Sequence, residues 1–523
     1  MMDDQRERLL TDEHVAEPQP QEASAVGVTQ PQLTATGDGE VVGSGKVLNV
    51  FFFSVIATLC NVAFGYDVGV VSGSLRDMAA TLNLSTFEQE AATSGLNFVA
   101  GFGALLVSGN VLDLIGRRWT IMCASLLLIA GAAVVSLAHD FPVLLAGRAL
   151  QGLGSGCSWA ACSVYITELA PAEYRGSLVT LADISINLGI LIGYCVDFAV
   201  RTQLADDRSL SWRLAMALSA VFPLLYCLIF PCLPETPRWL VMKGRDKDAL
   251  VVIRRTGARS ERAARQLLTE LKESHERQTY AELSWTQTLC PPTSALRRTV
   301  AVAVALGLAQ QLTGTEAILY YTPTLFDSLS EEHQFLANLS VGFCKFFGEL
   351  VAAYLAECVG RRILMIYGNF ALCAAIFGIA ASFMYNANVI VSVACLSAVM
   401  LTFSIGAGPF TFVVVNEMLP LPFRGKGVAT SVFFNRMGSG TVALTFLSLK
   451  NAIGVSNAFF MYGGIGVLAT VFYVGVLPDL AGMSLEQAEA ETIGVNGKED
   501  AFFSAEGDDE DDSDNNATCC TAL

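Results

Sequence analysis

The sequence predicts an all-α membrane protein whose twelve transmembrane helices form two pseudo-symmetric six-helix bundles. Only 15% of the 523 residues are charged and 53% are hydrophobic, whereas soluble globular proteins carry nearer a quarter of charged residues. The apolar residues gather in runs of roughly 20, the length that a helix needs to cross about 30 Å of hydrocarbon. Several motifs also recur at a nearly constant offset, and this repetition predicts the two bundles.

Twelve apolar runs are the predicted membrane-spanning helices. They lie near residues 47–73, 91–112, 118–138, 142–167, 177–201, 212–232, 299–325, 336–357, 363–385, 388–416, 427–450 and 456–477. The runs are too long and too uniformly apolar for barrel strands, which alternate and extend over about ten residues. Residues 1–46 are polar and acidic, so no cleavable signal peptide is expected.

These spans divide the chain into five predicted parts. The parts are a disordered cytoplasmic N-terminal tail at 1–46, a six-helix bundle at 47–232, a cytoplasmic linker with short helices at 233–298, a second six-helix bundle at 299–478 and an acidic cytoplasmic C-terminal tail at 479–523. Within the linker, an apolar stripe of Ala264, Leu267, Leu268 and Leu271 falls at helical spacing on a charged segment. We expect this stripe to lie against the cytoplasmic face of the bundles.

Basic residues in the short loops predict the orientation. Arginine and lysine follow spans 2, 4, 8 and 10 and are frequent in the linker. By the positive-inside rule these loops face the cytoplasm, and an even number of spans places both termini there too. We expect an integral, multi-pass protein of the plasma membrane rather than of an organelle.

The net charge of −17 comes largely from the tails, above all from the acidic run at 507–516. Such a run is typical of a solvated tail, so neither a basic partner nor a nucleic acid is inferred from it. The expected surroundings are the lipid bilayer and a small-molecule solute.

Neither cross-links nor catalysis is indicated. Most of the fourteen cysteines lie inside spans, where small apolar side chains belong, so no disulfide framework is expected. We find no metal-ligand cluster, phosphate loop or nucleophile constellation, and therefore expect no enzyme, no cofactor and no metal. Asn83 begins an Asn-Leu-Ser acceptor in the predicted outer loop after span 1, which predicts a glycoprotein.

Three motifs recur in both halves of the chain. Glu168…Arg175-Gly returns as Glu417…Arg424-Gly, Asp113…Gly-Arg117-Arg118 returns as Glu357…Gly-Arg361-Arg362, and Pro234-Glu235 is echoed by Pro478-Asp479. The offsets of about 244 to 249 residues place each motif at the same point of a six-span unit. Parallel repeats of this kind are typical of transporters that bind their solute between the repeats.

Two charges fall within predicted spans. Asp67 lies in span 1 and Arg148 starts span 4. A charge at mid-membrane costs about 2.5 to 3.5 kcal/mol even on the lenient insertion scale, so such a residue faces a partner or a wet cavity. If Arg148 moves nearer to or farther from Asp67, the proton affinity of the carboxylate changes, which is a proton-coupling device. The alternative is a fixed ion pair in a uniporter.

At this point the motifs resemble a known family, the sugar porter branch of the major facilitator superfamily. The matching stretches are FGYDVGV at 64–70, GRR at 116–118 and 360–362, GRALQGLG at 147–154, PETPRWL at 234–240, QQLTG at 310–314 and YYTP at 320–323. The resemblance spans roughly residues 50–490. It implies two bundles that rock about a central cavity and open it to one side at a time. Members that are proton symporters are similar to this chain in having Asp at the position of Asp67.

The resemblance also implies a substrate site. Gln310 and Gln311 stand where the family binds sugar hydroxyls with amides, which can both donate and accept. Tyr320, Tyr321, Gly408 and Asn435 also occupy family cavity positions. Other positions depart from the pattern: Asp183, Glu316, Lys345, Phe412 and Arg436 replace Gln, Asn, Asn, Trp and Trp. We expect the charged replacements to pair internally, Glu316 with Lys345 first, or to stay free for a charged ligand.

A cytoplasmic gate is implied by the repeated charged motifs. Its predicted residues are Arg117, Arg118, Glu168, Arg175, Glu235, Arg361, Arg362, Glu417 and Arg424. Carboxylate to guanidinium pairs among them can hold the halves together on the inner side and separate when the cavity opens inward. The alternative is that they only orient loops.

The sequence therefore predicts a transporter of a sugar or polyol, such as a hexose or inositol, that works by proton symport and alternating access. The alternatives are a uniporter, a carrier of a charged organic solute, and a non-transporting nutrient sensor. Loss of the span 10 Trp weakens the case for an ordinary hexose, because that ring is the platform on which a sugar packs. Another polyol, a sugar acid or an amino-bearing solute stays open.

Overall fold

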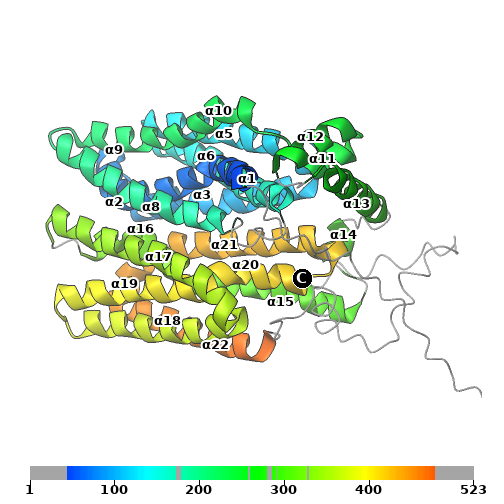
Figure 1. Cartoon of the computed structure of the whole chain (residues 1–523). Helices are drawn as coiled ribbons and strands as arrows, with labels where there is room; N and C mark the ends of the chain where they lie inside the picture. Colours follow the sequence, from blue (N-terminus) through cyan, green and yellow to red (C-terminus); the bar gives the residue numbers. More distant parts are fainter. Residues whose placement is uncertain are drawn as a thin grey trace, which may run out of the picture. The chain divides into compact units, whose positions relative to one another are not determined.

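The computed structural model describes residues 44–171, 178, 180–256, 260–279, 285–289, 291, 293–326 and 329–477. These residues are almost entirely helical (Figure 1). The predicted tails lie outside the described residues, apart from the first helical positions after residue 43. Arg175 lies outside them as well.

The first half of the described chain, residues 44–232, contains six bundle segments. They are α1 Ser44–Ala57 with α2 Leu59–Leu82, α3 Thr86–Leu106 with the π-helical turn η1 Val107–Val111 and α4 Leu112–Ile115, α5 Arg117–Ser136, α6 Phe141–Leu169, α8 Leu181–Gln203, and α9 Arg208–Ala217 with η2 Leu218–Ala220, α10 Val221–Ile229 and η3 Phe230–Cys232. The helix of span 1 continues past the predicted end at residue 73, because a helix need not stop where the hydrocarbon does.

The second half, residues 294–477, repeats this order. Its segments are α15 Ser294–Leu312 with α16 Thr315–Leu325, α17 Glu331–Val359, α18 Arg361–Met384, α19 Val389–Ile405 with α20 Ala407–Met418, α21 Leu421–Ile453 and α22 Val455–Val476. Four short helices lie between the halves in sequence: α11 Pro237–Met242, α12 Asp246–Thr256, α13 Glu261–Thr279 and α14 Trp285–Leu289.

Most of these segments are apolar enough to cross a membrane. Eight of the described helical segments meet that requirement by length and composition, and the pair Leu48–Ala57 and Leu59–Leu82, bent by 41°, makes a ninth. Three further long segments, α3 with its continuation, α6 and α21, are not among these nine, and each carries polar and charged side chains. They pack inside the bundle, where α6 and α21 both contact α3, so lipid does not surround their polar faces.

Two spans of the second half are interrupted by glycine. Between α15 and α16, Gly314 has a φ of 83°, which a residue with a side chain rarely adopts. Between α19 and α20, Gly406 packs directly against Gly368 of α18, where a Cβ on Gly406 would lie 2.9 Å from the Cα of Gly368. Each break frees backbone carbonyls inside the bundle, and such groups need polar partners there.

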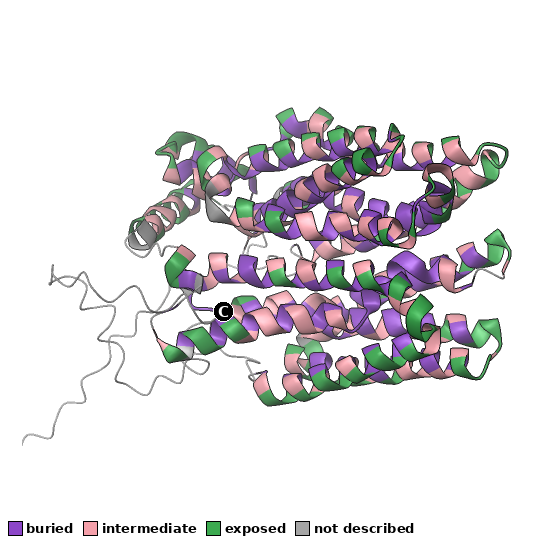
Figure 2. Ribbon diagram, turned by 180° about the vertical axis from the view of Figure 1, so that it is seen from behind, coloured by how far each residue is buried: buried purple, intermediate pink, exposed green. Residues whose placement is uncertain are grey.

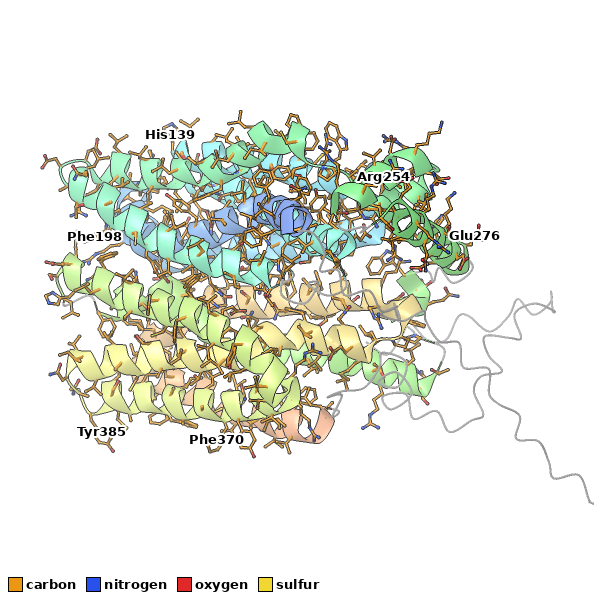
Figure 3. The ribbon with its side chains drawn as sticks, in the orientation of Figure 1. His139, Phe198, Arg254, Glu276, Phe370 and Tyr385 are labelled. Atoms are coloured by element: carbon orange, nitrogen blue, oxygen red, sulfur yellow. The ribbon has the colours of Figure 1, made fainter. Side chains whose placement is uncertain are left out.

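The two halves share a hydrophobic core at one end of the helices. At the end that carries the turns near residues 83, 139 and 205, one hydrophobic core takes side chains from both halves, including Tyr66, Trp212, Tyr321, Phe446 and Phe459. We call this the loop end. At the opposite end, which carries the linker and is called the linker end, the first half and the second half have separate cores. In Figure 3, His139 lies near the loop end and Arg254 and Glu276 lie at the linker end.

Burial follows the same plan. Buried and exposed residues alternate along the helices (Figure 2), and many of the exposed residues are large and apolar. Phe370, Leu468 and Val471 are each about two-thirds exposed, at 66%, 70% and 66%. An apolar outer belt of this kind is suited to lipid rather than to water.

The apolar stripe predicted in the linker lies on α13. Ala264 is fully buried, and Leu268 and Leu271 pack against the linker-end core of the first half, while Leu267 stays 38% exposed. The stripe therefore contacts the first half, as expected for a helix lying on the face of the bundle.

Close contact between α2 and α8 depends on glycine. A Cβ on Gly65 would lie 1.9 Å from the carbonyl oxygen of Ile186, so Gly65→Ala must push the two helices apart. We expect this change to destabilise the protein by about 1 to 3 kcal/mol, the usual cost of overpacking. The measurement is the midpoint of thermal unfolding in detergent.

The matched control is Gly464→Ala, in helix α22, where an added Cβ meets no atom within 4 Å. Because alanine favours a helix over glycine, this control should be neutral or slightly stabilising. Equal effects of the two changes would contradict the contact between α2 and α8.

Candidate functional site

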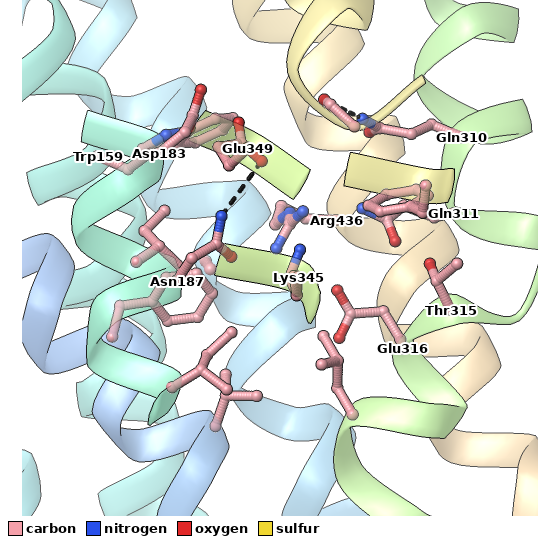
Figure 4. Close-up of a pocket in the computed structure, with 18 of the residues that line it drawn as sticks. Trp159, Asp183, Asn187, Gln310, Gln311, Thr315, Glu316, Lys345, Glu349 and Arg436 are labelled. Atoms are coloured by element: carbon pink, nitrogen blue, oxygen red, sulfur yellow. Dashed lines mark hydrogen bonds between the residues drawn. The ribbon is translucent and has the colours of Figure 1, made fainter. Parts of the chain in front are cut away.

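A cavity of about 120 Å³ lies between the two halves. A single buried water needs roughly 10 to 15 Å³ by this measure, so the cavity holds several waters or a small solute. The residues that line it are Phe64, Val68, Ala100, Ser155, Gly156, Trp159, Asp183, Ile186, Asn187 and Ile190 of the first half, and Gln310, Gln311, Thr315, Glu316, Leu319, Lys345, Glu349, Met400, Phe403, Gly408, Phe412 and Arg436 of the second. Figure 4 shows the polar side chains converging from both sides.

Gln310 connects the two broken spans of the second half. Its Nε2 donates to the carbonyl oxygens of Ala407 and Gly408, at 3.0 and 2.7 Å, just after the break at Gly406. Its Oε1 accepts from Asn435 Nδ2 at 2.5 Å. The amide therefore satisfies carbonyls near that break and fixes α15 against α20 and α21.

Asn435 is fully buried behind the cavity wall rather than in it. Its Nδ2 also donates to Gly307 O at 2.9 Å, and its Oδ1 accepts from Gln311 Nε2 at 3.4 Å and from Arg436 Nη2 at 2.7 Å. Asn435 thus positions two glutamines and an arginine that do line the cavity. The Oε1 of Gln311 is buried with no partner among the described residues, so it can accept from a solute.

The two predicted tyrosines belong to the loop-end closure. Tyr320 and Tyr321 are fully buried and do not line the cavity. The hydroxyl of Tyr320 accepts from Asn97 Nδ2 at 3.2 Å, and the hydroxyl of Tyr321 donates to Ala443 O at 2.7 Å and lies 2.6 Å from Thr93 Oγ1. Both rings hold the halves together in this conformation.

The other eight predicted substrate residues line the cavity: Asp183, Gln310, Gln311, Glu316, Lys345, Gly408, Phe412 and Arg436. Sequence reasoning missed seven polar or aromatic side chains that share the wall: Phe64, Ser155, Trp159, Asn187, Thr315, Glu349 and Phe403. A signal existed for two of them. Glu349 stands four residues after Lys345 and Asn187 four residues after Asp183, so each pair shares one helical face in an apolar span.

The predicted pairing of Glu316 with Lys345 is not formed. Among the described residues, none of the five charged side chains of the cavity, Asp183, Glu316, Lys345, Glu349 and Arg436, forms an ion pair with another charged group. Lys345 Nζ lies 5.1 Å from the ring centre of Phe403, and the guanidinium of Arg436 lies 5.8 Å from that of Trp159. These two cations thus face aromatic rings instead of the carboxylate expected for Lys345.

Asp67 and Arg148 form a buried ion pair, with 3% and 1% of the side chains exposed. Arg148 Nε also donates to Ala92 O at 2.8 Å, and its Nη1 donates to Gln151 Oε1 at 3.2 Å. Neither member of the pair lines the cavity, although Phe64 and Val68 of the same helix do. Of the two surroundings predicted for Asp67, the structure shows the partner and not the wet cavity.

The predicted gate residues pair within one half. Arg117 contacts Asp113 and Glu168, each at 2.9 Å, and Arg361 contacts Glu417. These partners belong to the same half in every case, so among the described residues the predicted pairing between halves is not observed. The two halves have separate hydrophobic cores at this end, and the pairs tie helix ends together inside each half.

The remaining gate residues brace loops at the same end. Glu235 Oε1 accepts from the backbone N–H groups of Arg117 and Arg118 at 3.0 and 3.2 Å, and burial raises the pKa of this carboxyl. Arg118 Nη1 donates to Leu233 O at 2.6 Å, and Arg424 Nε donates to Leu419 O at 3.2 Å. Arg362 stands in the first turn of α18.

Polar contacts between the halves lie at the loop end and at the level of the cavity. Glu90 accepts from the backbone N–H and the hydroxyl of Ser448, both at 2.6 Å, and Asn338 donates to Ser72 at 3.4 Å. Nearest the linker end, Asn187 Nδ2 donates to Glu349 Oε2 at 3.2 Å. The cavity is thus closed on the loop-end side.

A cluster of charges adds to this closure. Arg201 Nε lies 2.9 Å from Asp77 Oδ2, and Arg208 Nη2 lies 2.8 Å from Glu331 Oε1. Glu331 Oε1 is also 3.7 Å from Arg201 Nη2. Since Glu331 begins α17 and the other three residues lie in the first half, this cluster links the two halves electrostatically.

Two helical halves that share a core at one end and enclose a polar cavity define a membrane transporter. The family model for the sugar (and other) transporter family matches residues 53–491. The chain therefore belongs to that family. Membership of this family confirms the predicted fold class, an all-α membrane protein with two six-helix bundles.

Similar proteins support the assignment. The chain is 32% identical over 461 residues to the probable polyol transporter 6 of Arabidopsis thaliana, covering 84% of this chain and 93% of the relative. It is 30% identical to the glucose transporter GlcP of Staphylococcus epidermidis, covering 85% and 97%. A solved structure of the proton:xylose symporter XylE matches with a TM-score of 0.73 and 25% identity, covering 85% of this chain and 99% of that one.

Removing the charge that links the halves should weaken the loop-end closure. We expect Glu331→Gln to raise the accessibility of the cavity from the loop end by up to about fivefold, since a partly exposed ion pair is worth about 1 kcal/mol or less. The measurement is the labelling rate of a cysteine placed at Leu319, which lines the cavity, by an impermeant maleimide. The background lacks the exposed native cysteines.

The control is Glu332→Gln, an exposed neighbour in the same helical turn that the cluster does not include. It removes the same charge from the surface and should leave the labelling rate unchanged. Equal rates in both variants would show that the cluster does not hold the loop end closed.

Proposed function

We propose that this chain carries a sugar or polyol across the membrane together with a proton, by alternating access. The observation that carries the proposal is a polar cavity between two halves that share a core at the loop end and have separate cores at the linker end. Relatives named as polyol and glucose transporters and a structural neighbour named as a proton:xylose symporter support the solute class and the coupling.

In this proposal the linker end faces the cytoplasm and the loop end faces outward. The basic residues of the linker and of the Gly-Arg-Arg loops support this orientation through the positive-inside rule. The described conformation is then closed to the outside, both termini are cytoplasmic, and the membrane is the plasma membrane. Asn83, exposed in the turn after α2, lies on the outer side, where a glycan can be attached.

The cavity offers a polyol both hydrogen bonds and an aromatic wall. Gln311 has a free acceptor, and Thr315 and Asn187 present a hydroxyl and an amide. Trp159 and Phe412 meet edge to face with ring centres 5.4 Å apart. The indole that the sequence lacks in span 10 is thus supplied by α6 from the opposite half, and an apolar ring face can pack on it.

Asp67 and Arg148 form the proposed coupling pair. In the described conformation the carboxylate of Asp67 is paired with the guanidinium of Arg148 inside the first half. Rearrangement that moves α2 and α6 apart would free the carboxylate to bind a proton again. The predicted gate pairs act in this scheme by keeping each half rigid as the halves rock.

A charged organic solute is the second candidate. It is favoured by the five charged side chains of the cavity, none of which forms an ion pair within the described residues. Charges held apart in a site away from bulk water are costly unless water or a ligand solvates them. A sugar acid or an amino sugar would supply such a partner.

Asp67→Asn should abolish proton-driven uptake. The amide cannot bind and release a proton, so we expect accumulation of solute against its gradient to stop while exchange of solute across the membrane continues. The measurement compares uptake and counterflow in proteoliposomes with and without an inward proton gradient. Accumulation equal to that of the unaltered protein would contradict the coupling.

A competition panel separates the two solute classes. We expect D-sorbitol, myo-inositol and D-glucose to be taken up and to compete with one another, because the cavity combines amides with an aromatic wall. D-glucuronate and D-glucosamine carry the charges that the second candidate requires. Transport of either charged compound, undiminished by an excess of the neutral ones, would favour the second candidate instead.

A further inference from the structure

The charges of the cavity do not balance. Three carboxylates, from Asp183, Glu316 and Glu349, and two cations, from Lys345 and Arg436, line it, so its formal charge is minus one when all are ionised. The pair formed by Asp67 and Arg148 is neutral by itself and lies outside the lining. One acid of the cavity is therefore left without a countercharge.

Glu349 is the acid whose surroundings depend most on how the halves sit. Its side chain projects from α17 and only 6% of the residue is exposed. Its Oε2 accepts from Asn187 of α8, a bond that crosses between the halves. Glu316 makes no hydrogen bond with the described residues. Asp183, which belongs to the first half, has no hydrogen-bond partner among the described residues of the second half.

The charged groups around Glu349 come from each element that faces it. Asp183 of α8 is close enough for the two carboxylates to interact, and Lys345 lies one turn away on α17 itself. Glu316 of α16 and Arg436 of α21 complete the set. Two neighbouring carboxylates repel one another, and one bound proton relieves that repulsion.

We propose that Glu349 is a second proton-binding residue of the transport cycle, in addition to Asp67. This inference rests on the proposed proton symport. The carboxylate takes a proton from water on the outer side, becomes a neutral carboxyl, and returns the proton to water on the inner side. No other bond forms or breaks.

Protonation of Glu349 lowers the free energy needed to close the cavity around a neutral solute. When the halves close, water leaves and any net charge is stranded in a medium of low dielectric. One added proton brings the formal charge of the lining to zero. It also turns the bond from Asn187 from a charge-assisted into a neutral one, which is roughly half as strong, so the contact of α8 with α17 responds to the proton.

The test compares Glu349→Gln with Glu316→Gln, the same change on another wall of the same cavity. The unaltered protein and both variants are reconstituted in liposomes and assayed with D-sorbitol, or with D-glucose if only the sugar is transported. We expect Glu349→Gln to lose accumulation driven by a proton gradient and to keep counterflow. Glu316→Gln also alters the binding site and is expected to change the rate of uptake, but accumulation should still depend on the proton gradient.

A second measurement does not depend on transport. Infrared difference spectra of the detergent-purified protein, taken across a pH titration, report each carboxyl that gains a proton. The signal of one protonated carboxyl should disappear in Glu349→Gln and persist in Glu316→Gln.

The outcomes separate the two ideas. If the unaltered protein moves solute without protons, the proposed symport fails, and the infrared titration alone decides whether Glu349 binds a proton. If Glu349→Gln keeps the proton-to-solute ratio and the infrared signal of the unaltered protein, the inference is overturned while symport through Asp67 stands. Loss of coupling in Glu316→Gln alone would also overturn it.

Discussion

Hydrophobic packing across the halves at the loop end is the constraint on which the rest of the structure depends. Aromatic side chains such as Tyr66, Tyr321 and Phe446 exclude water there, whereas the linker ends keep separate cores. This packing closes the space between the halves on the loop-end side. Apolar packing is not directional. Hydrogen bonds at the loop end, such as those from Ser448 to Glu90, therefore fix how the two halves are aligned there.

The breaks in two helices of the second half turn this cavity into a binding site. A continuous helix satisfies its own backbone, but the interruption at Gly406 leaves carbonyls that Gln310 must satisfy. Asn435 then holds Gln310, Gln311 and Arg436 in one connected network. Asn435, which lies behind the wall of the cavity, is thus as polar as the side chains in the wall that it positions.

Charge is placed in two distinct ways within the same bundle. Asp67 and Arg148 neutralise each other away from the cavity, while Glu316, Lys345 and Glu349 line it without forming ion pairs among the described residues. Both arrangements avoid an isolated charge in lipid, the first by contact and the second by facing a polar cavity. A rocking motion of the halves changes the cavity and the contacts across it, whereas the pair of Asp67 and Arg148 lies within the first half.

Composition and periodicity by themselves determined that the chain spans a membrane with twelve helices, because the length of an apolar run depends only on the thickness of the hydrocarbon. The repeated Gly-Arg-Arg motifs likewise predicted the two halves. Tertiary structure alone decided that Trp159 meets Phe412, that Glu349 bonds to Asn187, that Asn435 lies behind the wall, and that the gate pairs stay within one half. These contacts join residues far apart in sequence, and their partners depend on which end of the halves is closed, which no local pattern encodes.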